Sequence, residues 1–218
     1  MQKLVIIGAG GFAREVAWLV DDINADKNTW ELLGFIDEDD AKYGVFYNNY
    51  PVLGDFDFLH KKDLKEPVYC VCAVGNPKNK RILVKKAEEW GYRFANLIHP
   101  SVKISKHVKI GVGNIICVGN VITVNVFIHN HVIINLNCTV GHDVIIDNYS
   151  TILPAVNISG NVRFGMGCNI GTNASIIQGV TVGEWSIIGA GATVTSDIPP
   201  NCTAVGVPAK PIKFHDQL

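Results

Sequence analysis

The second half of the chain carries hydrophobic residues at a constant spacing of six. The residue two positions before each of these hydrophobic residues is usually small or Val, and the residue directly after it is often Gly. Two inward side chains at this separation fit a short strand, and the other residues of each hexad turn a corner. Three such sides close a coil of about 18 residues, so the pattern predicts a parallel β-helix of about five stacked coils. The hexad positions are Ile98, Ile104, Ile110, Ile116, Ile122, Ile128, Ile134, Val140, Ile146, Ile152, Ile158, Phe164, Ile170, Ile176, Val182, Ile188 and Val194.

The first half has a different pattern, in which strand and helix signals alternate. Aliphatic runs at 3–7, 30–36 and 67–74 are separated by helical patterns at about 12–22 and 80–90. This order predicts a small α/β domain with a parallel sheet. Residues 1–97 also hold 28 of the 39 Asp, Glu, Lys and Arg residues. We therefore expect two domains, 1–97 and 98–218.

Composition and charge exclude several classes of partner. The 218 residues are 48% apolar and carry a formal net charge of -1, so neither a nucleic acid nor an anionic membrane is an expected partner. Apolar runs are too short to span a bilayer, and the glycines near the amino terminus do not fit a signal peptide. We expect a cytoplasmic protein. The six cysteines lack CxxC spacing, which argues against zinc and disulfides.

A glycine cluster lies between the first predicted strand and the first predicted helix. Gly8-Ala9-Gly10-Gly11 permits a tight turn, and the amino end of the following helix favours an anionic phosphate. Asp37 ends the second strand, where folds of this kind contact a ribose or a base. Fewer than 100 residues are available to this domain, so a mononucleotide fits better than NAD.

Four histidines stand out because the coils contain few titratable groups: His107, His129, His131 and His142. His142 falls at a predicted corner, and stacking by about 18 residues places Gly160 on the next coil, where it leaves space beside the imidazole. A free histidine titrates near pH 6.5 and is suited to accept a proton near neutral pH. His142 is therefore the candidate general base.

Asp143 is the candidate partner of His142. Adjacent side chains on a regular strand point to opposite faces, so the two can interact only if they lie in a bend. Such an acid would hold the imidazole and raise its basicity. The alternatives are a solvent-exposed Asp143, with Asn135 or Asn137 orienting His142 instead.

Several motifs together resemble one family of enzymes. The chain is similar to the sialic-acid O-acetyltransferase and UDP-amino-sugar N-acetyltransferase family of hexapeptide-repeat acyltransferases, whose fold is an α/β Rossmann-like domain followed by a left-handed β-helix. The resemblance covers nearly the whole chain. The motifs that carry it are Gly8-Ala9-Gly10-Gly11, Gly34-Phe35-Ile36-Asp37, Ala73-Val74-Gly75-Asn76, Asn96-Leu97-Ile98-His99, the stretch from Asn137 to Asp143, and Gly206-Val207-Pro208-Ala209-Lys210.

The resemblance implies a function and a set of residue roles. It implies that His142, supported by Asp143, deprotonates an acceptor amine that attacks acetyl-CoA, without a metal, in a homotrimer with sites between subunits. The implied nucleotide-sugar residues are Gly10, Gly11, Phe12, Asp37, Glu38 and Gly75. The implied acetyl-CoA residues are Thr151, Thr172, Gly189, Ala190 and Lys210. Two positions depart from the pattern: Thr151 stands where some relatives have a second histidine, and Glu38 stands where an Asp is usual.

The resemblance leaves alternatives open. The acceptor could be free sialic acid acylated on oxygen, whereas a UDP-4-amino-4,6-dideoxy sugar is the acceptor that the resemblance favours. A γ-type carbonic anhydrase would use His129, His131 and His142 as zinc ligands, but their positions within the coil differ. A binding module without catalysis would tolerate His142→Ala.

Overall fold

The computed structural model describes residues 1–58 and 67–216, and the chain divides into two compact units, Met1–Pro100 and Ser101–Leu218. The first unit has a six-stranded sheet in the order β3-β4-β2-β1-β5-β6. Among the strands in the described part of this unit, only β3 runs antiparallel to its neighbour, β4. The strands are β1 (Gln2–Ile7), β2 (Trp30–Ile36), β3 (Phe46–Tyr47), β4 (Tyr50–Gly54), β5 (Val68–Cys72) and β6 (Arg93–Phe94), and β7 (Leu97–Ile98) follows them in the chain.

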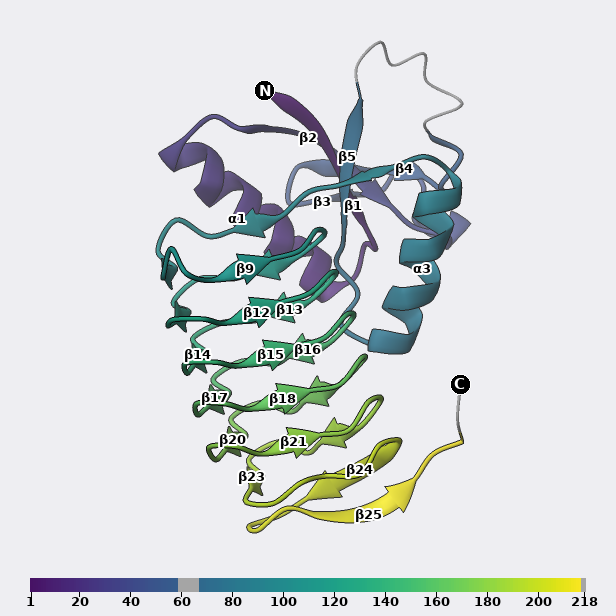
Figure 1. The fold of residues 1–218 in the computed structure, drawn as a ribbon. Coiled ribbons are helices and arrows are strands. Elements are labelled where there is room, and N and C mark those ends of the chain that lie inside the picture. Colours follow the sequence, from purple (N-terminus) through teal and green to yellow (C-terminus); the bar gives the residue numbers. More distant parts are fainter. Residues whose placement is uncertain (59–66, 217–218) are drawn as a thin grey trace. The chain divides into compact units, whose positions relative to one another are not determined.

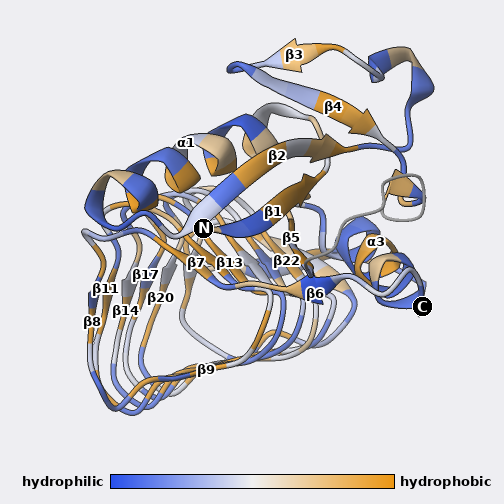
Figure 2. Cartoon of the chain, turned by 90° about the horizontal axis from the view of Figure 1, so that it is seen from above, coloured by the Kyte–Doolittle hydropathy of each residue, from blue (hydrophilic) through white to orange (hydrophobic). Residues whose placement is uncertain are grey.

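Two long helices connect strands of this sheet. The helix α1 (Gly11–Asp26) buries Ala13, Val16, Ala17 and Val20, which share one face because they are spaced by three or four residues. The other helix, α3 (Pro77–Glu89), begins three residues before the predicted start because the Asn76 side chain accepts a hydrogen bond from the Asn79 N–H and proline occupies the first turn. A short 3₁₀ helix, η1, spans Asp40–Lys42. Orange, hydrophobic segments run along α1, β1, β2 and β4 in Figure 2.

The second unit is a three-sided parallel β-helix whose coils stack one below another (Figure 1). Strands pair with a constant offset of one coil, for example Ile115 with Ile133 and Val121 with Thr139. The first side contains β10 (Ile115–Ile116), β13 (Ile133–Ile134), β16 (Thr151–Ile152), β19 (Asn169–Ile170), β22 (Ile187–Ile188) and β24 (Cys202–Val205), with β25 (Lys210–Phe214) antiparallel to β24.

The other two sides are built in the same way. The second side contains β8 (Lys103–Ile104), β11 (Val121–Ile122), β14 (Thr139–Val140), β17 (Asn157–Ile158), β20 (Ser175–Ile176) and β23 (Thr193–Val194). The third side contains β9 (Lys109–Ile110), β12 (Phe127–Ile128), β15 (Ile145–Ile146), β18 (Arg163–Phe164) and β21 (Thr181–Val182). Seen from above, β8, β11, β14, β17 and β20 line up behind one another as one side (Figure 2).

The hexad pattern accounts for the core of the β-helix. From Ile116 onward the hexad residues are buried, whereas Ile104 of the first coil is 37% exposed. The corners contain residues with positive φ, among them Asn125, Asn161 and Asn173, which tolerate the left-handed region better than most residues. The predicted fold class, an α/β domain followed by a left-handed parallel β-helix, is confirmed. Among the described residues, no helix is long and apolar enough to cross a membrane.

Candidate active site

The imidazole of His142 is held by the carboxylate of the next residue. Both residues lie in the corner between β14 and β15, and His142 Nδ1 is 2.8 Å from Asp143 Oδ2. The contact is possible because Asp143 has a φ of 60°, a left-handed conformation that removes the alternation of a regular strand. The two side chains therefore meet in a bend, which is the only geometry in which neighbouring residues of this sequence were expected to interact. Both side chains are about half exposed, at 53% and 52%.

The carboxylate of Asp143 is fixed by a second contact. Asn125, at the same corner one coil earlier, donates a hydrogen bond from Nδ2 to Asp143 Oδ1 at 3.2 Å. The hydrogen bond with His142, and then the one from Asn125, lower the pKa of Asp143 below its ordinary value. The carboxylate is thus anionic at neutral pH and can stabilise a positive charge on the imidazole.

Gly160, on the coil after His142, leaves room for the imidazole because it has no side chain. A Cβ atom at residue 160 would lie 2.4 Å from both Cε1 and Nε2 of His142, far closer than van der Waals contact. The backbone also joins the two corners, since the Asn161 N–H donates to the His142 carbonyl oxygen at 2.7 Å. The space that the sequence predicted beside Gly160 exists, and the ring of His142 itself fills it.

The remaining histidines have different surroundings. His131 is only 4% exposed and stacks on Tyr149, with ring centroids 5.5 Å apart. His129 packs edge-on against Phe127, with centroids 4.4 Å apart. Within residues 1–58 and 67–216, no group of three or more His, Cys, Asp or Glu side chains is placed to hold a metal ion.

The residues expected to contact acetyl-CoA lie mainly at another corner, between the first and second sides. Thr172 and Ala190 occupy neighbouring coils there, and the Gly191 N–H donates to the Thr172 carbonyl oxygen at 2.8 Å. Gly189 directly precedes Ala190. Gly171 allows the two neighbouring coils to approach closely at this corner, because a Cβ at residue 171 would lie 2.5 Å from the Ala190 nitrogen.

Thr151 and Lys210 have contrasting exposures. Thr151 is 1% exposed, so its burial lends no support to the expected contact with CoA. Lys210 is exposed at the start of β25. Within one chain, the Thr172 corner and the His142 corner are separated by the strands of the second side, so the structure does not bring these two sets of residues together.

The first unit contains a cavity of about 130 Å³ at the carboxyl ends of β1, β2 and β5. Two residues predicted to bind a nucleotide, Asp37 and Glu38, line it. Gly10 is the N-cap of α1, Gly11 and Phe12 are the first two residues of that helix, and Gly75 lies in the segment between β5 and α3. The full lining is Ile7, Gly8, Ile36, Asp37, Glu38, Phe56, Val74 and Leu83.

Hydrogen bonds fix the two acidic residues of this cavity. Asp37 Oδ2 accepts from the Ala9 N–H of the glycine turn at 2.9 Å, and Lys42 Nζ donates to Asp37 Oδ1 at 3.1 Å. The hydrogen bond with Asp37 is the largest cause that raises the pKa of Lys42. On the other side, Lys86 forms an ion pair with Glu38. Both carboxylates thus have a cationic partner, which lowers the repulsion that an anionic ligand would meet.

The sequence did not identify Phe56, Lys42 or Lys86 as parts of this site. Lys86 Nζ lies 5.1 Å from the centre of the Phe56 ring, and Phe56 itself lines the cavity. The spacing of three residues between Leu83 and Lys86 on α3 was an available signal, because such residues share a helix face. Phe56 carries no comparable signal, since it follows β4 in an irregular segment.

Comparisons with known proteins agree with the fold of the chain. Residues 3–87 match the PglD N-terminal domain, and residues 161–196 match the bacterial transferase hexapeptide repeats. A GDP-perosamine N-acetyltransferase of Escherichia coli O157:H7 is 31% identical over 215 residues, which cover 95% of each chain. A local match of 58 residues, 57% identical, links the chain to a protein of Schizosaccharomyces pombe described as a candidate acetyltransferase. The chain spans 25% of that protein's length.

Solved structures of the same architecture are also similar. PerB from Caulobacter crescentus, in complex with CoA and GDP-perosamine, has a TM-score of 0.85 at 30% identity, and the match covers 98% of each chain. The acetyltransferase domain of PglB from Neisseria gonorrhoeae, in complex with acetyl coenzyme A, has a TM-score of 0.87 at 34% identity over 97% of this chain and 99% of that one. WeeI from Acinetobacter baumannii has a TM-score of 0.88 at 30% identity over 97% of this chain and 100% of that one.

Proposed function

Because this chain belongs to the hexapeptide-repeat acyltransferase family that contains the sialic-acid O-acetyltransferases and UDP-amino-sugar N-acetyltransferases, we propose that it acetylates the amine of a nucleotide-linked sugar with acetyl-CoA. The observation that carries the proposal is the His142–Asp143 pair, half exposed at a corner of the β-helix. Relatives solved with CoA, with acetyl coenzyme A and with GDP-perosamine support the choice of donor and acceptor.

The geometry of the pair fits a general base. With Nδ1 donating its proton to Asp143, Nε2 of His142 keeps a lone pair that can accept a proton from the acceptor nitrogen. As that N–H bond breaks, the nitrogen attacks the thioester carbonyl carbon and forms the amide bond. The carbon–sulfur bond then breaks, and the CoA sulfur leaves with the proton returned by the imidazolium. The anionic Asp143 stabilises the imidazolium that exists between these two transfers.

Each substrate has candidate residues. We propose that the nucleotide binds at the cavity lined by Asp37 and Glu38. Gly10, Gly11 and Phe12 at the amino end of α1, and Gly75 after β5, complete this proposed site. Acetyl-CoA is assigned to the corner formed by Thr172, Gly189 and Ala190, with Lys210 near a phosphate. The two corners are separate in one chain, which supports a homotrimer whose sites lie between subunits. We also expect the enzyme in the cytoplasm.

The test is a thiol-release assay with acetyl-CoA and a panel of acceptors. The panel contains a UDP-4-amino-4,6-dideoxy sugar, which we favour as the acceptor, together with GDP-perosamine and free sialic acid. We expect release of CoA thiol with an amino sugar linked to a nucleotide and none with free sialic acid. Mass spectrometry of the product then identifies the acylated atom. Turnover on a hydroxyl acceptor alone would overturn the proposal.

A further inference from the structure

Asn125 touches the proposed catalytic pair, but the proposed function gives it no role. Its Nδ2 donates to Asp143 Oδ1 at 3.2 Å, whereas His142 Nδ1 lies 2.8 Å from the other carboxylate oxygen, Oδ2. After the hydrogen bond with His142, this contact is the largest cause that lowers the pKa of Asp143. Within residues 1–58 and 67–216, the Asn125 side chain has no hydrogen bond to His142 itself. Any effect of Asn125 on the base must therefore pass through Asp143.

The backbone holds Asp143 against the coil that contains Asn125. The two residues occupy the same corner position on successive coils, because β11 pairs with β14 and β12 pairs with β15. The Asp143 N–H donates to the Val124 carbonyl oxygen at 3.1 Å. A main-chain bond and a side-chain bond thus join Asp143 to the same coil, and together they fix the direction of its carboxylate.

Asn161 shows that the shape of the corner does not by itself produce this contact. Asn125, Asp143 and Asn161 follow one another at the same corner position, with nearly equal φ values of 58°, 60° and 56°. Asparagine tolerates this left-handed conformation, so φ alone explains an Asn at both positions. Among the described residues, however, the Asn161 side chain has no hydrogen bond, whereas the Asn125 side chain bonds to Asp143. The place of Asn125 one coil before the pair gives it a contact that its counterpart lacks.

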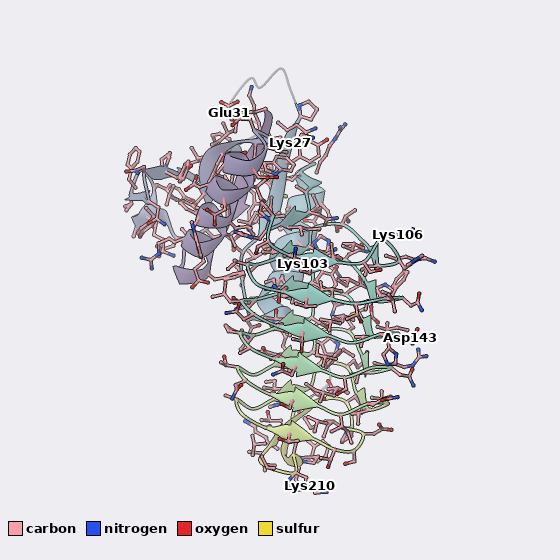
Figure 3. The ribbon with its side chains drawn as sticks, turned by 90° about the vertical axis from the view of Figure 1, so that its left-hand side faces the viewer. Lys27, Glu31, Lys103, Lys106, Asp143 and Lys210 are labelled. Atoms are coloured by element: carbon pink, nitrogen blue, oxygen red, sulfur yellow. The ribbon has the colours of Figure 1, made fainter. Side chains whose placement is uncertain are left out.

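Few other charged groups lie near the pair. The same corner positions on the coils directly before and after it, residues 124, 125, 160 and 161, are not titratable. On the described strands that flank these positions, Arg163 of β18 is the one charged residue. Lys106 and His107 lie two coils before, at about 10 Å for a stacking distance of roughly 4.8 Å. Figure 3 shows Lys106 and Asp143 along the same edge of the β-helix. The carboxylate of Asp143 is thus the anionic group next to the imidazole, and its direction matters.

We propose that Asn125 is a positioning residue for acetyl transfer, which keeps the Asp143 carboxylate turned toward Nδ1 of His142 and thereby keeps Nε2 directed at the acceptor amine. The inference rests on the proposed function, because it assigns a role within that reaction. The final torsion of an aspartate side chain is broad and roughly two-fold, so a carboxylate without the Asn125 donor rotates more freely. The imidazole then loses its fixed orientation and its anionic partner for part of the time.

The test compares Asn125→Gly with Asn161→Gly. Glycine adopts the left-handed conformation readily, so both variants keep the corner and lose only a side chain. We expect Asn125→Gly to lower kcat about fivefold with KM for both substrates unchanged, because a half-exposed contact contributes less than a buried hydrogen bond to a charged group. Asn161→Gly should match the original protein. An unchanged kcat in Asn125→Gly would overturn the proposal.

A double-mutant cycle shows whether Asn125 acts through Asp143. In the Asp143→Gly background, Asn125→Gly should lower kcat no further, because the carboxylate that Asn125 positions has been removed. A direct contact between Asn125 and a substrate would instead produce the same fall in both backgrounds, and that result would overturn the positioning role.

Titration of the imidazole by NMR separates this inference from the proposed function. The His142 signal is identified by its absence in His142→Ala. We expect it to titrate at lower pH in Asn125→Gly than in the original protein, because a carboxylate that turns away stabilises the imidazolium less, and we expect no change in Asn161→Gly. This shift in a protein that transfers no acetyl group would contradict the proposed function alone. Acetyl transfer with both kcat and the titration unchanged in Asn125→Gly would contradict the role of Asn125 alone.

Discussion

At the scale of single residues, the candidate site depends on what surrounds one imidazole. Asp143 holds His142 through Nδ1, and Gly160 admits the ring against the next coil. Neither contact involves the hydrophobic core, since both side chains of the pair are about half exposed. Changes to this pair should therefore affect acetyl transfer without unfolding the β-helix.

The first prediction concerns His142→Ala. Loss of a general base typically lowers a rate by about 10²- to 10⁴-fold, and we expect a fall of this size in kcat. The melting temperature should stay near that of the original protein because the side chain is half exposed. Steady-state thiol release and thermal unfolding measure the two effects. His129→Ala is the control, because His129 packs against Phe127 and has no proposed role. Equal activity in His142→Ala and the original protein would contradict the mechanism.

The second prediction concerns pH. The pKa of Asp143 is lowered, so this carboxylate is already anionic across the range in which activity is measured and its own protonation does not limit the rate. Asp143→Asn removes the negative charge that favours the imidazolium. We therefore expect the acid limb of kcat/KM to move to lower pH while the maximal rate falls. A pH profile of both proteins tests this expectation, and an acid limb that stays in place would mean that Asp143 does not act on the base.

At the scale of elements, α3 contains a buried cation. Lys80 in its first half is 1% exposed, and burial lowers its pKa from 10.5 to about 7. The unfolded chain thus binds more protons at Lys80 than the folded chain does between about pH 7 and the ordinary value of 10.5. It follows that the contribution of this residue to stability increases with pH over this interval.

The third prediction uses Lys80→Met. We expect the melting temperature of the original protein to rise between pH 7.0 and about 7.8, below the ordinary pKa of about 8.5 at which cysteine thiols of the unfolded chain ionise. Lys80→Met should lose most of this rise. Thermal unfolding at several pH values measures the slope for both proteins. Lys85→Met, on the same helix, is the control. An equal slope in Lys80→Met and the original protein would show that Lys80 is charged in the folded state at neutral pH.

The two units differ in how much the sequence predicts. Every coil of the β-helix repeats one local pattern, so the spacing of six residues predicts its strands and corners, including the corner of His142 and Asp143. The α/β unit depends on contacts between distant segments. The short strands β3, β4 and β6 were not predicted, nor was the contact of Lys86 with Phe56, because nothing in the local pattern relates α3 to the segment after β4.

At the scale of the whole molecule, the repeat that builds the β-helix also separates the two corners that we propose to act in catalysis. Asp143 and His142 lie between the second and third sides, whereas Thr172 and Ala190 lie between the first and second. A thioester bound at the Thr172 corner of one chain must meet an imidazole from another corner. Association of identical chains around a threefold axis would bring different corners of neighbouring subunits together. The trimer is therefore a requirement of the proposed mechanism rather than an addition to it.

The fourth prediction tests this requirement by complementation. His142→Ala removes the base, and Ala190→Trp blocks the proposed acetyl-CoA corner at an exposed position. Each variant alone should be inactive. In mixed trimers from co-expression, about a quarter of the sites would combine an intact His142 from one subunit with an intact Ala190 from its neighbour, so activity should return. A site built within one chain would never regain both residues. Mixed trimers that stay inactive would thus contradict a site between subunits, provided that native mass spectrometry shows both variants in the same assembly.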